Sequence, residues 1–162
     1  MDSRLERLQK DAIEHNVCSE YLKKWQNAKS KKQLVDIALS SQGCIFMCTS
    51  IEQGWGIESD YLRKNFEPFI NRKYVMEDKY SSCMYVKNKG VVVADTTLLL
   101  IIDSDMTVSV PKNMITKLYV CGDSKVKVKG TGRVIVVRYG DSVNVAVSVE
   151  LQNAKIIDGE YE

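Results

Sequence analysis

Gly122-Asp123-Ser124-Lys125-Val126-Lys127-Val128 is a polar turn followed by alternating valines, and it returns as Gly140-Asp141-Ser142-Val143-Asn144-Val145-Ala146-Val147. A degenerate copy, Asp103-Ser104-Asp105-Met106-Thr107-Val108-Ser109-Val110, precedes both. The turn therefore recurs about every 18 to 20 residues. A short turn-and-strand unit that recurs at this period is typical of a β-solenoid, in which successive coils stack on one another.

Short strand-like segments extend this pattern from residue 83 to about residue 157. They are rich in β-branched residues and are separated by Gly, Asp, Ser, Asn or Pro. The predicted strands are 91–93, 98–102, 107–110, 117–120, 125–128, 134–137 and 143–149. Their centres lie about eight to ten residues apart, which fits two strands per coil and about four coils.

Side chains alternate between the two faces of a strand, so the valines at positions 126 and 128 are predicted to point inward. Lys125, Lys127 and Lys129 are then predicted to point outward. The alternative is an antiparallel sandwich or meander, with hairpin turns at 130–132 and 139–142. We favour the parallel solenoid, because a meander does not need the same turn sequence at every second strand.

The first 75 or so residues have helical periodicity instead. Ser19 and Ser59 are predicted to cap helices, and Ser30 and Gln33 are predicted to form a reciprocal capping box. Gly43 is predicted to weaken or break the helix that Ser30 begins, and residues 44–48 are predicted to lie at the centre of the helical core. We therefore predict an α+β protein, with a helical domain over 1–80 that covers the first coil of a β-solenoid domain over 81–162.

The composition excludes several function classes. The chain has 162 residues with 23 Lys plus Arg and 21 Asp plus Glu, a net charge of +2, which argues against both a strongly basic nucleic-acid binder and an acidic mimic of nucleic acid. No segment has the length or purity of a membrane span. Five scattered cysteines and an N-terminus without an apolar signal segment lead us to expect reduced thiols in a cytoplasmic protein.

Candidate catalytic and metal-binding residues are few. The only histidine, His15, lies on the polar side of a predicted helix, and no base is spaced to activate a nucleophile. Cys44 and Cys48 are interpreted as buried core thiols, because a metal site would need further ligands nearby. The aspartates of the turns lack the dense glycine pattern of a calcium-binding β-roll. We therefore predict a protein that is not an enzyme and has no cofactor and no metal.

Two groups of residues are candidates for binding a partner. Lys125, Lys127 and Lys129 form an outward basic row, and Arg133 and Arg138 follow on the next pass, so the Lys125 to Arg138 face is a candidate site for phosphate or nucleic acid. The second group is aromatic and lies near the junction of the two halves: Trp55, Tyr74 and Tyr80. Trp and Tyr dominate the energetics of protein interfaces, but for Trp55 we favour packing of the helical half onto the first coil.

The chain resembles a loose family of short uncharacterised proteins from Bacteroides-type gut bacteria, their phages and mobile elements. The similarity rests on Trp25, on Lys32-Gln33-Leu34-Val35-Asp36, on Leu62-Arg63-Lys64-Asn65-Phe66 and on the Asp-Ser repeats, and it extends from about Trp25 to about Val149. The resemblance implies a phage or mobile-element setting and assigns no functional residues.

Together these observations lead us to expect a non-enzymatic accessory factor that binds a host or phage protein, such as an inhibitor of a host defence system. A solenoid offers a long rigid wall suited to binding a macromolecule. The alternatives are a structural, virion-associated protein that forms a homo-oligomer, and a nucleic-acid-binding protein that uses the Lys125 to Arg138 face. We expect no association with a membrane.

Overall fold

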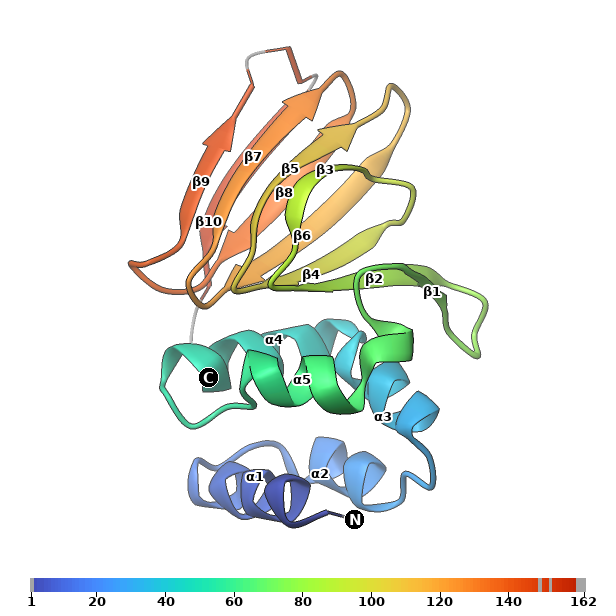
Figure 1. Ribbon diagram of the computed structural model, residues 1–162, viewed down its shortest axis with the longest axis vertical. Coiled ribbons are helices and arrows are strands. Elements are labelled where there is room, and N and C mark those ends of the chain that lie inside the picture. The colour runs from blue at the N-terminus through green and yellow to red at the C-terminus, as the bar shows by residue number, and fades with distance from the viewer. Residues whose placement is uncertain (1, 149, 152, 160–162) are drawn as a thin grey trace.

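The helices come first and the strands follow, as Figure 1 shows. The computed structural model describes residues 2–148, 150–151 and 153–159. The helices are α1 (Ser3–Glu14), α2 (Ser19–Gln26), α3 (Lys31–Ala38), α4 (Ser41–Glu52), α5 (Ser59–Asn65) and the short 3-10 helix η1 (Glu67–Phe69). The strands are β1 (Lys73–Val75), β2 (Ser81–Val86), β3 (Lys89–Val93), β4 (Leu98–Ile102), β5 (Asp105–Val110), β6 (Ile115–Cys121), β7 (Lys125–Gly130), β8 (Arg133–Arg138), β9 (Asn144–Val147) and β10 (Asn153–Asp158).

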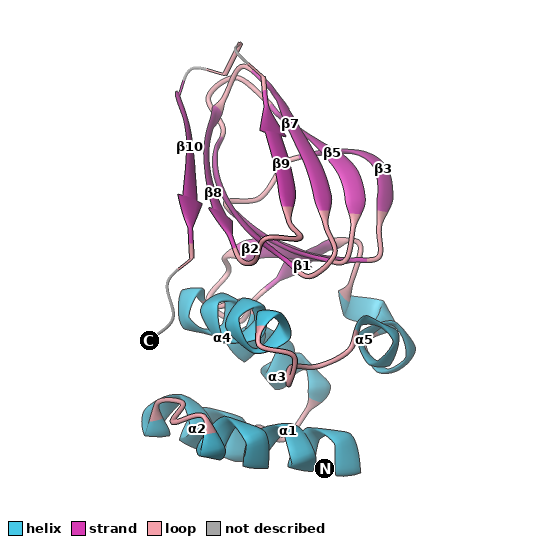
Figure 2. Ribbon diagram, turned by 90° about the vertical axis from the view of Figure 1, so that its left-hand side faces the viewer, coloured by secondary structure: helices cyan, strands magenta, loops and turns pink. Residues whose placement is uncertain are grey.

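Two facing sheets form a parallel β-solenoid of about four coils (Figure 2). Sheet A has the order β1-β2-β4-β6-β8-β10, and sheet B has the order β3-β5-β7-β9. Each coil contributes one strand to each sheet, and every pair is parallel except β1 with β2. The predicted α+β fold with a parallel solenoid is confirmed, and the antiparallel alternative is wrong.

The inward side chains of both sheets form one apolar core inside the solenoid. Leu99, Leu118 and Val136 lie side by side in successive coils of sheet A, and each is at most 1% exposed. On β7, Val126 and Val128 are buried, whereas the lysines beside them are exposed. The predicted alternation is thus confirmed, and stacking buries apolar columns that one coil alone would leave in water.

A ladder of buried serines connects the turns between sheet A and sheet B. Ser104 Oγ accepts the backbone N–H of Asn88 at 3.0 Å, and Ser124 Oγ accepts the N–H of Ser104 at 3.1 Å. Each of these hydroxyls also donates within its own turn, Ser104 to the carbonyl of Ile102 and Ser124 to that of Cys121, so the ladder joins one coil to the next. Lys125 pairs with Asn144, so Val143, and not Ser142, lies beside Ser124. The third copy of the repeat is therefore displaced by one residue in space.

Replacing Ser124 by alanine is expected to lower the free energy of unfolding by about 2 kcal/mol. The change would leave the buried N–H of Ser104 without its acceptor. Ser142→Ala is the matched control, because this exposed hydroxyl contacts only the carbonyl of Gly122, and we expect a change of less than about 0.5 kcal/mol. Urea unfolding of both variants measures the difference, and equal midpoints would contradict a structural role for the ladder.

The helix starts differ from the prediction at three positions. The Ser30 hydroxyl caps α3 by accepting the N–H of Gln33, but the Gln33 side chain accepts the N–H of Lys29 and not that of Ser30. The N-cap residues of α2 and α5 are Cys18 and Glu58, so Ser19 and Ser59 begin these helices without capping them. The Ser59 hydroxyl instead donates to Asp103 in a turn of the solenoid.

Gly43 lies inside α4 and does not break a helix. The break is at Leu39 and Ser40, and the Ser40 hydroxyl accepts the N–H of Gly43 at 3.0 Å to begin α4. Glycine is needed here because a Cβ atom would lie 1.9 Å from the carbonyl oxygen of Ile37 at the end of α3. In the described residues no single helix is long and apolar enough to cross a membrane; α3 and α4 pass that test only together, and an 86° bend separates them.

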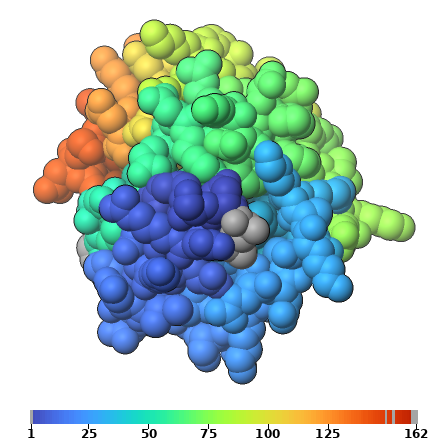
Figure 3. Space-filling model, turned by 60° about the horizontal axis from the view of Figure 1, so that its bottom comes forward, coloured from blue at the N-terminus to red at the C-terminus, as the bar shows by residue number. Residues whose placement is uncertain are grey.

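The helical half packs against sheet A. Side chains on the outer surface of its strands, near their carboxyl ends, join the helical core: Met84, Val86, Leu100, Ile102, Tyr119, Cys121, Val137 and Tyr139. They come from four successive coils, whereas we expected the helices to cover the first coil alone. Figure 2 shows the helices beneath the solenoid, where the strands of sheet A end, and Figure 3 shows α1 and α2 forming the surface at that end of the molecule.

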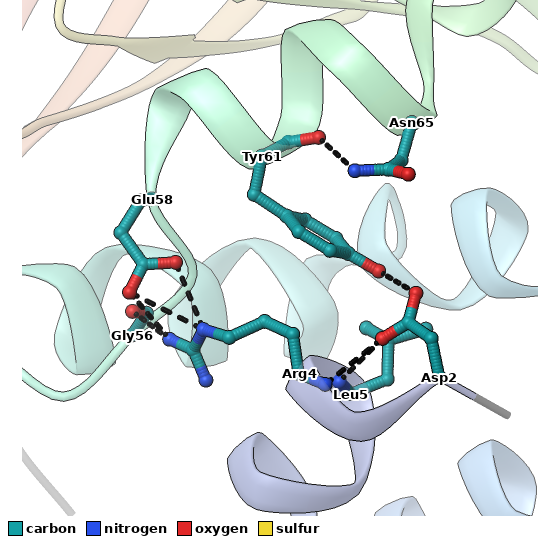
Figure 4. Close-up of polar contacts among 7 residues, drawn as sticks. All are labelled: Asp2, Arg4, Leu5, Gly56, Glu58, Tyr61 and Asn65. Carbon is teal, nitrogen blue, oxygen red and sulfur yellow. Dashed lines mark hydrogen bonds and ion pairs between the residues drawn. The ribbon is translucent and has the colours of Figure 1, made fainter.

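A cluster of polar contacts joins the start of α1 to α5 and to the segment that precedes α5 (Figure 4). Asp2 caps α1 by accepting the N–H groups of Arg4 and Leu5, and it also accepts the hydroxyl of Tyr61. Arg4 donates to the Glu58 carboxylate at 2.8 Å. These contacts hold the pKa of Asp2 and of Glu58 below their ordinary values, chiefly through the Tyr61 hydroxyl and the Arg4 guanidinium respectively.

Candidate functional site

The outward side chains of sheet B form a regular surface that we call the sheet B face. Its residues are Lys89, Val91, Val93, Asp105, Thr107, Ser109, Lys125, Lys127, Lys129, Asn144 and Ala146. The parallel register aligns them in rows across the strands, and one such row is Lys89, Asp105, Lys125 and Asn144. Each side chain is partly or fully exposed.

This face is basic with an apolar border. It carries four lysines and one aspartate, so it has a local excess of positive charge although the chain as a whole has a net charge of only +2. On the edge strand β3, Val91 is 64% exposed and Val93 is 59% exposed. These two valines add exposed apolar surface next to the charged rows.

The helices leave the sheet B face open. They lie beneath the solenoid, and Figure 2 shows no helix drawn across β3, β5, β7 and β9. Within residues 2–148, 150–151 and 153–159, none of the face residues belongs to the apolar core that the helices form. The carboxyl ends of the sheet A strands, by contrast, are covered.

The two candidate arginines do not share this face. Arg133 and Arg138 lie on β8 in sheet A, whereas the three lysines lie on β7 in sheet B. Arg138 is also neutralised by Asp158, with 2.7 Å between Nη2 and Oδ1. The Lys125 to Arg138 face proposed from the sequence is therefore divided between two sheets, because β7 and β8 are consecutive in the chain but cross from one wall to the other.

The candidate aromatic residues lie in three different environments. The Trp55 ring stacks on His15 with 4.4 Å between ring centroids and packs edge-on against Phe46, so its ring contacts lie within the helical half. Tyr74 is buried, and its hydroxyl donates to Asp36 of α3 at 2.5 Å. Tyr80 is 67% exposed and lies in the loop between β1 and β2, which projects from one side of the molecule (Figure 1). These three residues do not form one patch.

Two hollows of the molecule are candidate ligand sites, but neither has side chains arranged for a specific ligand. A cavity of about 70 Å³ between the helix layers is lined by apolar and aromatic side chains such as Leu8, Trp25, Phe46 and Leu62. It has no charged group to orient a ligand. A surface hollow of about 520 Å³ beside the sheet B face combines three cations, Arg63, Lys87 and Lys89, with three aspartates, Asp103, Asp105 and Asp123, so its charges balance.

Four of the five thiols are buried, including Cys44 and Cys48 as predicted, and Cys18 is exposed. Cys44 and Cys48 are both 0% exposed on α4, opposite the buried Cys121 of β6. Burial raises the pKa of both thiols above the ordinary value and that of Cys83 to about 11, so these thiols stay protonated at neutral pH and are poor nucleophiles. Among the residues that the structure describes, no three side chains of His, Cys, Asp or Glu are grouped to hold a metal ion.

Comparison of the chain with protein-family models, curated proteins and solved structures finds no match. The sheet B face is therefore argued from its own geometry. Sequence reasoning identified its three β7 lysines but missed Lys89, Val91 and Val93. The signal was present, because these three alternate along β3 in the same way that the lysines alternate along β7.

Proposed function

We propose that this chain is a non-enzymatic binding protein that docks an acidic protein surface on the sheet B face. The observation that carries the proposal is the open, flat face with four lysines, one aspartate and a border of two exposed valines. A rigid solenoid wall loses little conformational entropy on binding, which favours affinity for a partner of matching shape. The lysines supply electrostatic steering toward an acidic partner, and the valines supply apolar contact.

A protein partner fits this face better than nucleic acid does. The face has no aromatic side chain on which a base could stack, and Asp105 lies in the same row as Lys89 and Lys125. The separation of Arg133 and Arg138 from the lysines also reduces the number of cations that one nucleic-acid strand could contact. Nucleic-acid binding by the three β7 lysines is the second candidate.

The resemblance to phage and mobile-element proteins suggests the setting. In that setting the partner would be a protein of the host cell, and a component of a host defence system is the class we propose. One form of a virion-associated role is an assembly that grows by stacking solenoids end to end. The pairing of β1 with β2 argues against such growth, because it occupies the edge of β2 at the amino-terminal end of sheet A.

Charge reversal on β7 tests the proposal. The immobilised variant Lys125→Glu/Lys127→Glu/Lys129→Glu is expected to retain at least tenfold less of the host protein than the immobilised wild-type chain does. The reason is that three attractive charges become repulsive. Retention by the wild-type chain is expected to fall as the salt concentration rises from about 0.05 M to 0.5 M, since screening weakens exposed charge pairs. Mass spectrometry identifies the retained protein.

The control carries the same change of charge elsewhere. Lys23→Glu/Lys24→Glu/Lys29→Glu alters three exposed lysines of the helical half and is expected to retain the partner as the wild-type chain does. Equal retention by both triple variants would overturn the assignment of the face. Salt-dependent binding of single-stranded DNA or RNA that only the β7 variant loses would favour the second candidate.

A further inference from the structure

The edge strands at the two ends of sheet A differ in whether their outer edge is paired. At the amino-terminal end of sheet A, the antiparallel strand β1 pairs with β2 and occupies its edge. At the carboxyl-terminal end, β10 pairs with β8 on one side only, and all six of its residues are exposed. Ile156, on the inner side of this strand, is 42% exposed, and Ile157, on the outer side, is 38% exposed. Among the described strands, β10 is the longest with an unpaired edge.

The backbone bonds show which peptide groups are unpaired. Gly159 donates its N–H to the carbonyl of Arg138 at 2.7 Å, and peptide groups alternate in direction along a strand. The odd-numbered residues of β10 therefore bond to β8. The N–H and C=O groups of Ala154, Ile156 and Asp158 point away from the sheet, where another strand could pair with them.

We propose that β10 pairs antiparallel with β10 of a second copy of this chain, around a two-fold axis through Ile156. In this register Ile156 lies opposite its own copy, and Ala154 lies opposite Asp158 of the other chain. These are the residues whose peptide groups face outward, so each pair exchanges both of its backbone hydrogen bonds. The result is a continuous sheet across the two copies.

The charges of β10 favour this register. Asp158 is already neutralised by Arg138 of its own chain, with 2.7 Å between Oδ1 and Nη2. In the chosen register Lys155 lies opposite Ile157, whereas a shift that centred the pair on residue 155 would place two lysines directly opposite each other, which is destabilising. Strands with unpaired edges usually carry several charges, a proline or a bulge against such pairing, and β10 has only Lys155 left uncompensated.

The dimer goes beyond the proposed function and stands whether or not the sheet B face binds an acidic protein. A two-fold axis perpendicular to sheet A leaves both sheet B faces pointing the same way. This is because sheet B lies face to face with sheet A in each copy (Figure 2). Two docking faces would then lie side by side, and a partner with repeated sites would gain from avidity. A six-residue edge is small beside the roughly 800 Å² per partner of a standard interface, so we expect a weak dimer that forms only at high protein concentration.

Sedimentation velocity of the full chain tests the dimer. The mass is expected to rise from the 18.4 kDa of one chain toward twice that value as the concentration increases to about 0.5 mM. Ile156→Pro removes an outward N–H while sparing the bonds to β8, so this variant is expected to remain a monomer. Ile156→Ala keeps the N–H and is expected to dimerise at least in part. A wild-type chain that stays monomeric over this range, a dimer that survives Ile156→Pro, or species that grow beyond two copies would each overturn the proposal.

Cross-linking tests the register with substitutions at exposed positions. In a Cys18→Ser background, which removes the one exposed native thiol, Ile156→Cys is expected to form a disulfide-linked dimer under mild oxidation. The two Cα atoms would be about 5.5 Å apart, which suits a disulfide. Ile157→Cys is the matched control, because its two Cα atoms would be about 8 Å apart, which is too far. Equal cross-linking at both positions would contradict the register.

Discussion

Replacing Leu118 by alanine is expected to lower the free energy of unfolding by about 3 to 5 kcal/mol. Leu118 is 0% exposed in β6, between Leu99 of the preceding coil and Val136 of the following one. The change removes buried apolar contacts from a central coil and leaves a cavity that neighbouring strands cannot close without moving out of register. Because small domains are stable by only about 5 to 15 kcal/mol in total, the loss is large, and urea unfolding measures it directly.

The control for this prediction lies on the same strand. Ile115 is 60% exposed on the outer side of β6, and Ile115→Ala is expected to cost less than about 1 kcal/mol. Equal destabilisation by the two variants would mean that the inward column is not the main apolar core of the solenoid.

Replacing Gly130 by alanine is expected to destabilise the protein by about 3 to 5 kcal/mol. Gly130 has a φ of +117°, which L side chains rarely adopt, and a Cβ atom would lie 2.2 Å from the carbonyl oxygen of Val110. That oxygen also accepts the N–H groups of Thr131 and Gly132, so it cannot move without loss of the turn from β7 to β8. Thermal and urea unfolding of Gly130→Ala would both report the effect.

Gly54→Ala separates the two causes. Gly54 has a similar φ of +86°, but a Cβ atom there would meet nothing within 4 Å, so only the conformational cost of about 1 to 2 kcal/mol is expected. If Gly130→Ala were no more destabilising than Gly54→Ala, the close approach of Gly130 to Val110 would have no energetic weight.

Local sequence patterns correctly predicted the solenoid and the buried side of β7. The alternation of valine with lysine over residues 125–129 predicted which side of β7 is buried, because a period of two leaves no other choice once one side is in water. No strand was predicted at the positions of β1, β2 and β10. The residues of β10 are exposed on both sides, so that strand has no inward pattern for a periodicity argument to detect.

The candidate site was predicted less well, since adjacency in sequence was taken for adjacency in space. Arg133 follows Lys129 by four residues, yet the turn at 130–132 carries the chain from sheet B to sheet A. Lys89 and Lys125 are distant in sequence, yet both lie on the sheet B face, in one row with Asp105 between them. Only the register of the strands, which depends on the length of every turn, determines such neighbours.

The sequence by itself determined the helical and solenoid halves and the outward direction of the β7 lysines, because each follows from local periodicity, and the recurring turn favoured parallel over antiparallel stacking. Only the tertiary structure decided where the helices pack, which face stays open and which strand is left with an unpaired edge. The helices cover the sheet A strands near Tyr119 and Cys121 because apolar side chains on the outer surface of four coils meet there. That surface exists only once the coils have stacked.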